Sequence, residues 1–192
     1  MPHRLILIRH SQSQPEPGRP ASRWALTEAG RWLGARLADR LAAYAPDRIV
    51  TSHERKASET GAIVAARLSL PIVLVEGLHE HRREHAGWLP GPAFEQAVAD
   101  FFARPDDLVF GEETASQARA RFEAAVRDVI DIYPSQTIAL VTHGTVMTLF
   151  VAAYTSIAPL PFWKSLGMPA LVVLSLPDLE LLEVIERLEI RD

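Results

Sequence analysis

The chain has 192 residues, 48% apolar and 23% charged, with a formal net charge of −4. This is the composition of a globular protein, and we expect residues 1–192 to form a single domain with one sizeable core. The charge gives no footprint for nucleic acid or an anionic membrane, and the lack of cysteine excludes a thiol nucleophile and thiolate metal ligands. No run approaches the roughly 18–20 apolar residues of a membrane span, and the apolar run at 5–8 is too short for a signal peptide, so we expect a cytoplasmic protein.

The first half of the chain alternates short apolar runs with helical patterns. In chain order, it predicts a strand at 5–8, a loop at 11–25, a helix from 28 to about 44, a strand at 48–51, a helix at 53–69 and a strand at 72–75. Thr27 is the expected N-cap of the first helix, and Pro46 follows its end. The segment Thr51-Ser52-His53-Glu54 is similar to a capping box for the second helix.

The second half continues the alternation and ends in an apolar pair of segments. It predicts a long loop at 76–92, helices at 93–104 and 113–133, a strand at 137–142, a helix at 144–154, and an antiparallel pair at 170–176 and 181–190. The pattern indicates an α/β three-layer sandwich, with a mostly parallel central sheet, helices on both faces and an antiparallel edge strand.

Two of the predicted strands are followed closely by a histidine. The first delivers Arg9 and His10, and the strand at 137–142 delivers His143 and Gly144. In open α/β sheets, ligands bind outside the carboxyl ends of the strands, so these side chains are expected to converge. A glycine after a strand-end histidine lets the chain turn into a helix whose first N–H groups can bind an anion, and an arginine supplies a forked cation. Together these residues indicate a site for a phosphoryl group.

Five short motifs in this order resemble those of the histidine phosphatase superfamily, which has the phosphoglycerate-mutase-like fold. The motifs are Leu7-Ile8-Arg9-His10, Leu26-Thr27-x-x-Gly30, the segment 52–60, Leu78-x-Glu80 and Val141-Thr142-His143-Gly144. The resemblance covers residues 4 to about 155, most of the chain. Each motif is weak by itself, whereas the ordered set is specific.

The resemblance implies a role for each matching residue. His10 is the implied nucleophile that forms a phosphohistidine, His143 stabilises the transition state, and Glu80 is the implied general acid. The implied phosphate-binding residues are Arg9, Lys56, Ser13 and Gly144. Glu84 and Glu76 remain alternatives for the acid. The resemblance implies neither a metal nor a cofactor.

The sequence departs from the family pattern around two motifs. Ser11 replaces the usual glycine after His10, and Glu16 falls where asparagine is expected, although Ser13 keeps a hydroxyl. In the second motif the position of the family arginine is taken by Lys56, while Arg55 precedes it. Neighbours on a helix point about 100° apart, so only one of these two cations can face the site, and spacing favours Lys56.

The resemblance implies a phosphomonoester hydrolase acting through His10 on a small molecule or a phosphoprotein. The loop 81–85 lacks the sequence common in the mutases, which argues against phosphoglycerate mutase itself. Phosphoglycerate-mutase-like transfer, or a catalytically weak protein that binds a phosphorylated ligand, remain the alternatives. A homodimer paired through the last strands also stays open.

One motif points to a different class of enzyme. His81-x-x-Glu84-His85 matches the H-x-x-E-H pattern of zinc peptidases, which needs both histidines on one face of a helix. Gly77, Gly87 and Pro90 surround it, and no apolar-striped helix carries it, so we expect a loop without metal.

Overall fold

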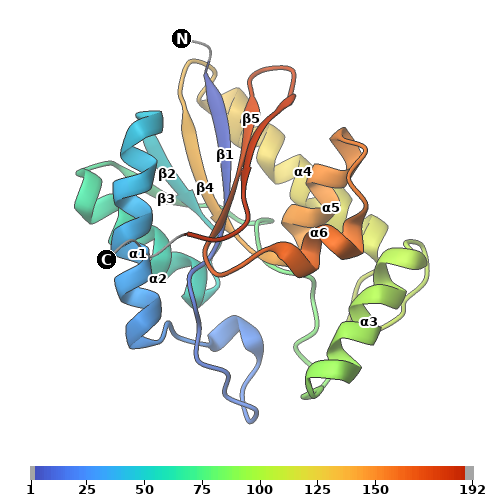
Figure 1. Ribbon diagram of the computed structural model, residues 1–192. Helices are drawn as coiled ribbons and strands as arrows, with labels where there is room; N and C mark the ends of the chain where they lie inside the picture. The colour runs from blue at the N-terminus through green and yellow to red at the C-terminus, as the bar shows by residue number, and fades with distance from the viewer. Residues whose placement is uncertain (1–2, 189–192) are drawn as a thin grey trace.

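A computed structural model describes residues 3–188 and shows a six-stranded sheet between two layers of helices (Figure 1). The strands are β1 (Arg4–Arg9), β2 (Arg48–Thr51), β3 (Ile72–Leu74), β4 (Ile138–Thr142), β5 (Ala170–Ser175) and β6 (Leu181–Ile185). Their order across the sheet is β3-β2-β4-β1-β5-β6. The first four run parallel, whereas β5 is antiparallel to both of its neighbours. The predicted fold class is therefore confirmed.

The helices divide between the two faces of the sheet. They are α1 (Glu28–Leu41), α2 (Arg55–Leu68), α3 (Gly91–Ala103), α4 (Ala115–Ile132), α5 (Gly144–Tyr154) and α6 (Pro159–Ser165), with 3-10 turns η1 (Ala21–Arg23) and η2 (Ala42–Tyr44). In Figure 1, α1 and α2 cover one face and α4 to α6 the other. Successive residues of a strand point to opposite faces, so Leu5 and Leu7 join the core under α4 and α5, and Ile6 and Ile8 join the core under α1 and α2.

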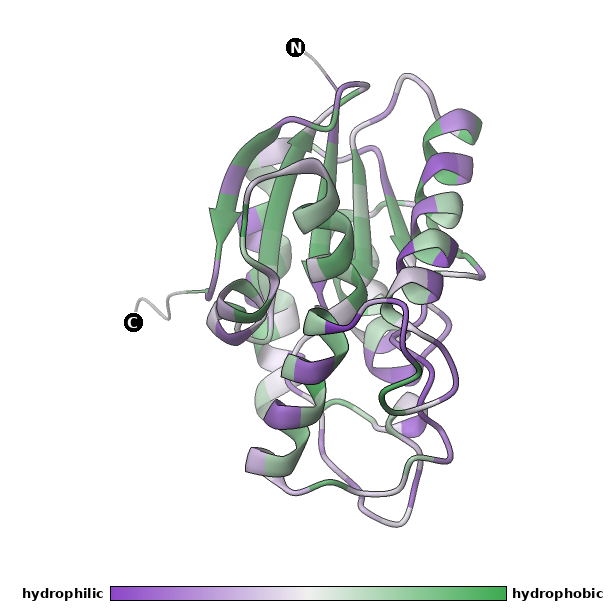
Figure 2. Ribbon diagram, turned by 90° about the vertical axis from the view of Figure 1, so that its right-hand side faces the viewer, coloured by the Kyte–Doolittle hydropathy of each residue, from purple (hydrophilic) through white to green (hydrophobic). Residues whose placement is uncertain are grey.

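Burial on both faces explains the continuous apolar runs of the central strands. Figure 2 shows these strands as almost uniformly hydrophobic. All five residues of β4 are buried, as are the inner four of β1. Within residues 3–188, no helix has the length and apolar character needed to cross a membrane.

The structure differs from the sequence prediction at three places. Helix α2 begins at Arg55 with Glu54 as N-cap, and no side chain caps it, so the predicted capping box is wrong: the Ser52 hydroxyl instead accepts a bond from the Glu54 N–H, at 3.2 Å. Helix α6 was not predicted, because its seven residues include two prolines and make barely two turns. The predicted last strand ends at Ile185, and residues 189–190 lie outside the described part.

Candidate active site

The carboxyl ends of the two central strands place His10 beside His143. Arg9 pairs with Thr142 in the parallel register of β1 and β4, so the two histidines leave the sheet together. The His10 N–H donates to the Thr142 carbonyl at 2.9 Å. The two imidazole rings meet edge to face with their centroids 5.2 Å apart, and both are buried. The convergence expected at this end of the sheet is present.

His10 is held in the state that a nucleophile requires. Its Nδ1 lies 2.8 Å from the Ser11 carbonyl oxygen, which can only accept, so Nδ1 carries the proton. The lone pair is therefore on Nε2. Burial, and after it the charge of Lys56, lowers the pKa of His10 well below its usual value. The imidazole is neutral at pH 7, with a free nitrogen able to attack phosphorus.

The loop after His10 is fixed against the start of α1 and the middle of α2. The Ser11 hydroxyl donates to the Gly30 carbonyl at 2.7 Å, and the Ser11 N–H donates to the Thr60 hydroxyl at 3.0 Å. The chain passes so close to α1 that a Cβ on Gly30 would lie 2.0 Å from the Gln12 carbonyl oxygen. The Thr27 side chain caps the Gly30 N–H at 2.8 Å. The Leu-Thr-x-x-Gly motif is thus a support for the loop that carries His10.

Ser13 lies further along that loop, where it forms an isolated antiparallel bridge with Leu26. Among the described residues, no hydrogen bond links its hydroxyl to His10 or His143. The expectation that the Ser13 hydroxyl donates a hydrogen bond to phosphate therefore rests on the sequence motif alone.

The first turn of α2 brings Lys56 into the site and turns Arg55 away from it. Lys56 is 4% exposed; its Nζ donates to the Ala21 carbonyl at 2.7 Å and forms an ion pair with Glu54. The Arg55 side chain is half-exposed, and its Nε donates to Glu59 at 2.8 Å. As the helical spacing predicts, the side chain of Lys56 faces the site and that of Arg55 points away from it.

Glu54 belongs to the site and was missed by the sequence analysis. One carboxylate oxygen pairs with Lys56 and lies 3.8 Å from His143 Nδ1, and the other accepts the Glu80 N–H at 2.8 Å. Burial alone would raise the pKa of Glu54, but the Lys56 ammonium and the hydrogen bond from the Glu80 N–H together lower it. A carboxylate at the start of a helix is expected to face solvent near the helix dipole. The one sequence signal that Glu54 belongs to the site is that it lies two residues after Ser52, at the carboxyl end of a strand.

His143 is buried between these groups. Its Nε2 lies 2.9 Å from the Ser52 hydroxyl, and its Nδ1 has no hydrogen-bond partner among the described residues. Burial, followed by the charge of Lys56, lowers the pKa of His143 well below its usual value. A ring with one nitrogen uncommitted can still bond a ligand oxygen.

Glu80 occupies the N-terminus of α5. Its two carboxylate oxygens accept the N–H groups of Thr145 at 3.0 Å and Val146 at 3.2 Å, and that of His81 at 2.9 Å. Burial would raise its pKa, but Arg83 and these hydrogen bonds outweigh that effect and lower the pKa to about 2. The helix end that the sequence assigned to phosphate thus holds an ionised carboxylate of the chain itself.

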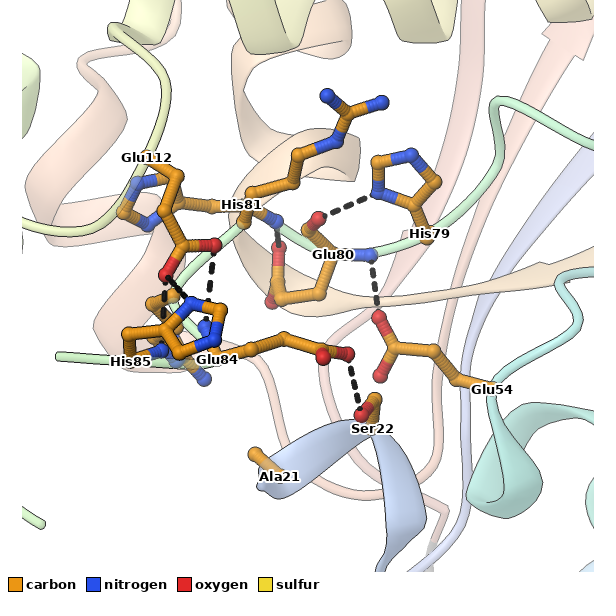
Figure 3. A pocket seen from close by; sticks show the side chains of 11 residues that line it. Ala21, Ser22, Glu54, His79, Glu80, His81, Glu84, His85 and Glu112 are labelled. Atoms are coloured by element: carbon orange, nitrogen blue, oxygen red, sulfur yellow. Dashed lines mark hydrogen bonds and ion pairs between the residues drawn. The ribbon is translucent and has the colours of Figure 1, made fainter. Parts of the chain in front are cut away.

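The two alternatives to Glu80 lie in different surroundings. A cavity of about 340 Å³ opens beside the site, lined by Glu54, Glu80 and Glu84 among others (Figure 3). Glu84 accepts the Ser22 hydroxyl there at 2.8 Å. The side chain of Glu76 is 87% exposed and lies 3.5 Å from His53, away from this cavity.

Arg9 and Gly144 are in direct contact. A Cβ on Gly144 would lie 3.0 Å from Arg9 Nε, so the glycine makes room for the buried guanidinium. Arg9 Nη1 donates to the Leu166 carbonyl, and its Nε has no hydrogen-bond partner among the described residues. A buried arginine N–H with no partner in the chain is available to bond an anion.

The zinc-peptidase motif has the wrong geometry. Residues 81–85 are not helical. His81 is buried with its ring 4.1 Å from that of Phe101, whereas His85 is exposed and bonds to Glu112 (Figure 3). Across residues 3–188, no three histidine or carboxylate side chains gather as metal ligands.

Comparisons with known proteins identify the family and the fold of the chain. A model of the histidine phosphatase superfamily (branch 1) matches residues 5–178. A search of curated proteins finds no match. Among solved structures, Bacillus stearothermophilus YhfR superimposes with a TM-score of 0.76 and 25% identity, covering 96% of each chain. A mycobacterial glucosyl-3-phosphoglycerate phosphatase gives 0.67 and 24% over 91% of each chain. A phosphoserine phosphatase from Entamoeba histolytica gives 0.72 and 16%, covering 95% of this chain and 96% of its own.

Proposed function

The chain belongs to the histidine phosphatase superfamily, and on that premise we propose that it hydrolyses a phosphomonoester through a phosphohistidine on His10. The observation that carries this proposal is the neutral imidazole of His10 with Nε2 free, beside His143 and Lys56. In the first step Nε2 bonds to phosphorus and the ester P–O bond breaks. In the second step water attacks the phosphohistidine and releases inorganic phosphate.

Cationic and N–H groups around His10 hold the phosphoryl oxygens in this proposal. Arg9 and Lys56 supply positive charge, and His143 supplies a ring nitrogen that bonds one oxygen. Gly144 and Ser13 complete the set through an N–H and a hydroxyl. The charge that develops on the phosphoryl group is then balanced by groups already in place before the reaction.

Glu80 is the proposed proton donor to the leaving oxygen. In the free site its carboxyl is ionised, with a pKa of about 2. A phosphate dianion placed beside it raises that pKa, because two like charges at close range disfavour each other. Glu80 takes up a proton from solvent as the substrate binds and passes it to the leaving oxygen, and the carboxylate then takes a proton back from the attacking water.

The test compares wild type with His10→Ala on p-nitrophenyl phosphate and on a radiolabelled substrate. We expect the variant to lose nearly all activity and the acid-labile phosphoenzyme to disappear with it. His53→Ala, a change at a half-exposed histidine outside the cavity, is the control and keeps both. Equal activity in wild type and His10→Ala would rule out the mechanism.

A second candidate is a catalytically weak protein that binds a phosphorylated ligand. The observation in its favour is that Glu80 is ionised and accepts three backbone N–H groups, so in the free site it holds no proton for a leaving group. Calorimetry that shows tight binding of a phosphomonoester, with no phosphate released over hours, would favour this reading over the enzyme.

A further inference from the structure

A second cavity, of about 510 Å³, adjoins the first. We call it the aromatic pocket and define it by the rings of Trp24, Trp88, Phe94 and Phe110, which line it. Ala21, Arg83 and Glu84 line both cavities, so the two spaces lie side by side. Cavities of about 300–1,000 Å³ are of the size that holds small ligands.

The aromatic pocket is built from two loops that the sequence leaves far apart. Trp24 follows η1, and its indole N–H donates to the carbonyls of Glu16 and Arg19 at 3.2 and 3.1 Å, which fixes its ring. Trp88, from the loop before α3, meets it with the ring centroids 5.8 Å apart. Trp88 stays 50% exposed. A half-exposed indole on a fixed aromatic wall offers a large apolar surface that a ligand can cover.

Arg83 stands where the two cavities join. Its guanidinium lies 4.7 Å from the centre of the Phe94 ring, and its Nη1 is buried without a hydrogen-bond partner among the described residues. Its charge also acts on Glu80, since it lowers the pKa of that carboxyl. One side chain therefore borders both the proposed phosphoryl site and the aromatic wall.

From this shared lining we propose that the aromatic pocket binds the leaving group of the substrate, and that the substrate is a small phosphomonoester of an alcohol that carries an aromatic ring. The inference rests on the proposed function, because it is the phosphoryl site that orients the ester. With its phosphoryl group at His10, such an ester passes Arg83 and lays its ring against Trp88 and Trp24. Offset or edge-to-face ring contacts favour an aromatic group over an aliphatic one of equal size.

The experiment compares three esters whose alcohols have nearly equal acidity: 2-phenylethyl, 2-cyclohexylethyl and n-propyl phosphate. Leaving-group chemistry is then matched, and differences in kcat/KM report binding in the pocket. We expect kcat/KM for the phenyl ester to exceed that for the propyl ester at least tenfold, and that for the cyclohexyl ester severalfold. A ratio of about one between kcat/KM for the phenyl ester and that for the propyl ester would overturn the proposal. Equal kcat/KM for the phenyl and cyclohexyl esters would overturn the claim that the pocket prefers an aromatic ring.

A pocket variant and a matched control assign the preference to the aromatic pocket. Trp88→Ala should reduce the phenyl-to-propyl ratio toward one. Trp32→Ala removes an indole of similar exposure, 48%, from α1 and should keep the ratio of the wild type. An unchanged ratio in Trp88→Ala would place the preference elsewhere and overturn the assignment. Because Trp88 is half-exposed, its removal is not expected to unfold the chain.

Phosphonates separate this inference from the proposed function. 3-Phenylpropylphosphonate and butylphosphonate replace the ester oxygen by carbon and cannot be hydrolysed at phosphorus. Calorimetry should give a Kd at least tenfold lower for the phenyl compound. If no ester is hydrolysed but this difference is found, the hydrolase proposal fails and the pocket assignment stands. If the esters are hydrolysed without preference and the phosphonates bind equally, the pocket assignment fails and the hydrolase stands.

Discussion

The change Lys56→Met separates a phosphate ligand from a structural ion-pair partner. It removes the charge and keeps most of the side-chain length. The pair with Glu54 is nearly dry, with 5% and 11% of the two side chains exposed. Removing one partner of a buried pair costs about 3–5 kcal/mol, because the other charge stays buried without compensation. We expect the free energy of unfolding to fall by about that amount.

The same change should lower activity for a separate reason. A hydrogen bond to a charged group contributes about 1.5–3 kcal/mol. If Lys56 contacts the phosphoryl group in the transition state, its loss lowers kcat/KM about ten- to a hundredfold. Arg55→Met is the matched control: its half-exposed pair with Glu59 contributes about 0–1 kcal/mol, and the change should leave kcat/KM near that of wild type.

The double variant Lys56→Met/Glu54→Gln distinguishes the two effects. Without an uncompensated buried charge it should regain most of the lost stability, measured by urea unfolding. Without the cation its kcat/KM on p-nitrophenyl phosphate should stay low, at a temperature where every variant is folded. Glu54→Gln alone gives the reference for its own loss. A double variant that regains wild-type activity together with stability would show that Lys56 is not a phosphate ligand.

Two further predictions concern the strand ends. Gly144→Ala places a Cβ 3.0 Å from the buried Arg9 Nε, so the guanidinium must shift and kcat/KM should fall about tenfold. Gly34→Ala, whose Cβ would meet only the Ile63 side chain, at an ordinary contact distance of 3.4 Å, should leave kcat/KM unchanged, and equal losses in the two variants would contradict the assignment. Burial, with Lys56 next, holds the pKa of His10 and His143 below the usual value, whereas the unfolded chain protonates both below about pH 6.5. The unfolded state then binds more protons, so stability should fall as the pH drops from 6.5 to 5, by up to about 1.4 kcal/mol per pH unit for each ring. Urea unfolding should show a smaller fall for His10→Asn/His143→Asn, and an equal fall in both proteins would refute the cause.

The strand-end residues could be predicted because their positions follow from the apolar runs before them. A run buried on both faces is recognisable without its partners, and the residue after it must lie at the edge of the sheet. His10 and His143 are found in this way. The rotation of about 100° per residue along a helix similarly predicts that Lys56, and not Arg55, faces the site.

Contacts that depend on the third dimension escaped the sequence. From the sequence, Glu54 is expected to be an exposed carboxylate at the start of a helix. Only the fold shows that Lys56 and His143 lie beside it. Trp24 and Trp88 lie far apart in the chain, and no local sequence pattern predicts that their rings are in contact. The position of Glu80 on the N–H groups of α5 depends on how the loop 76–92 lies across the end of the sheet.

The carboxylates of Glu54 and Glu80 give the empty site an almost electroneutral interior, with one partnered to Lys56 and the other to the first turn of α5. An inorganic phosphate ion that enters must displace bonds that are already made, so it gains less than it would at bare cations and N–H groups. The expected consequence is weaker product inhibition, because the phosphate released at each turnover gains new bonds only from unpaired atoms such as those of Arg9, Arg83 and His143, and not from Lys56.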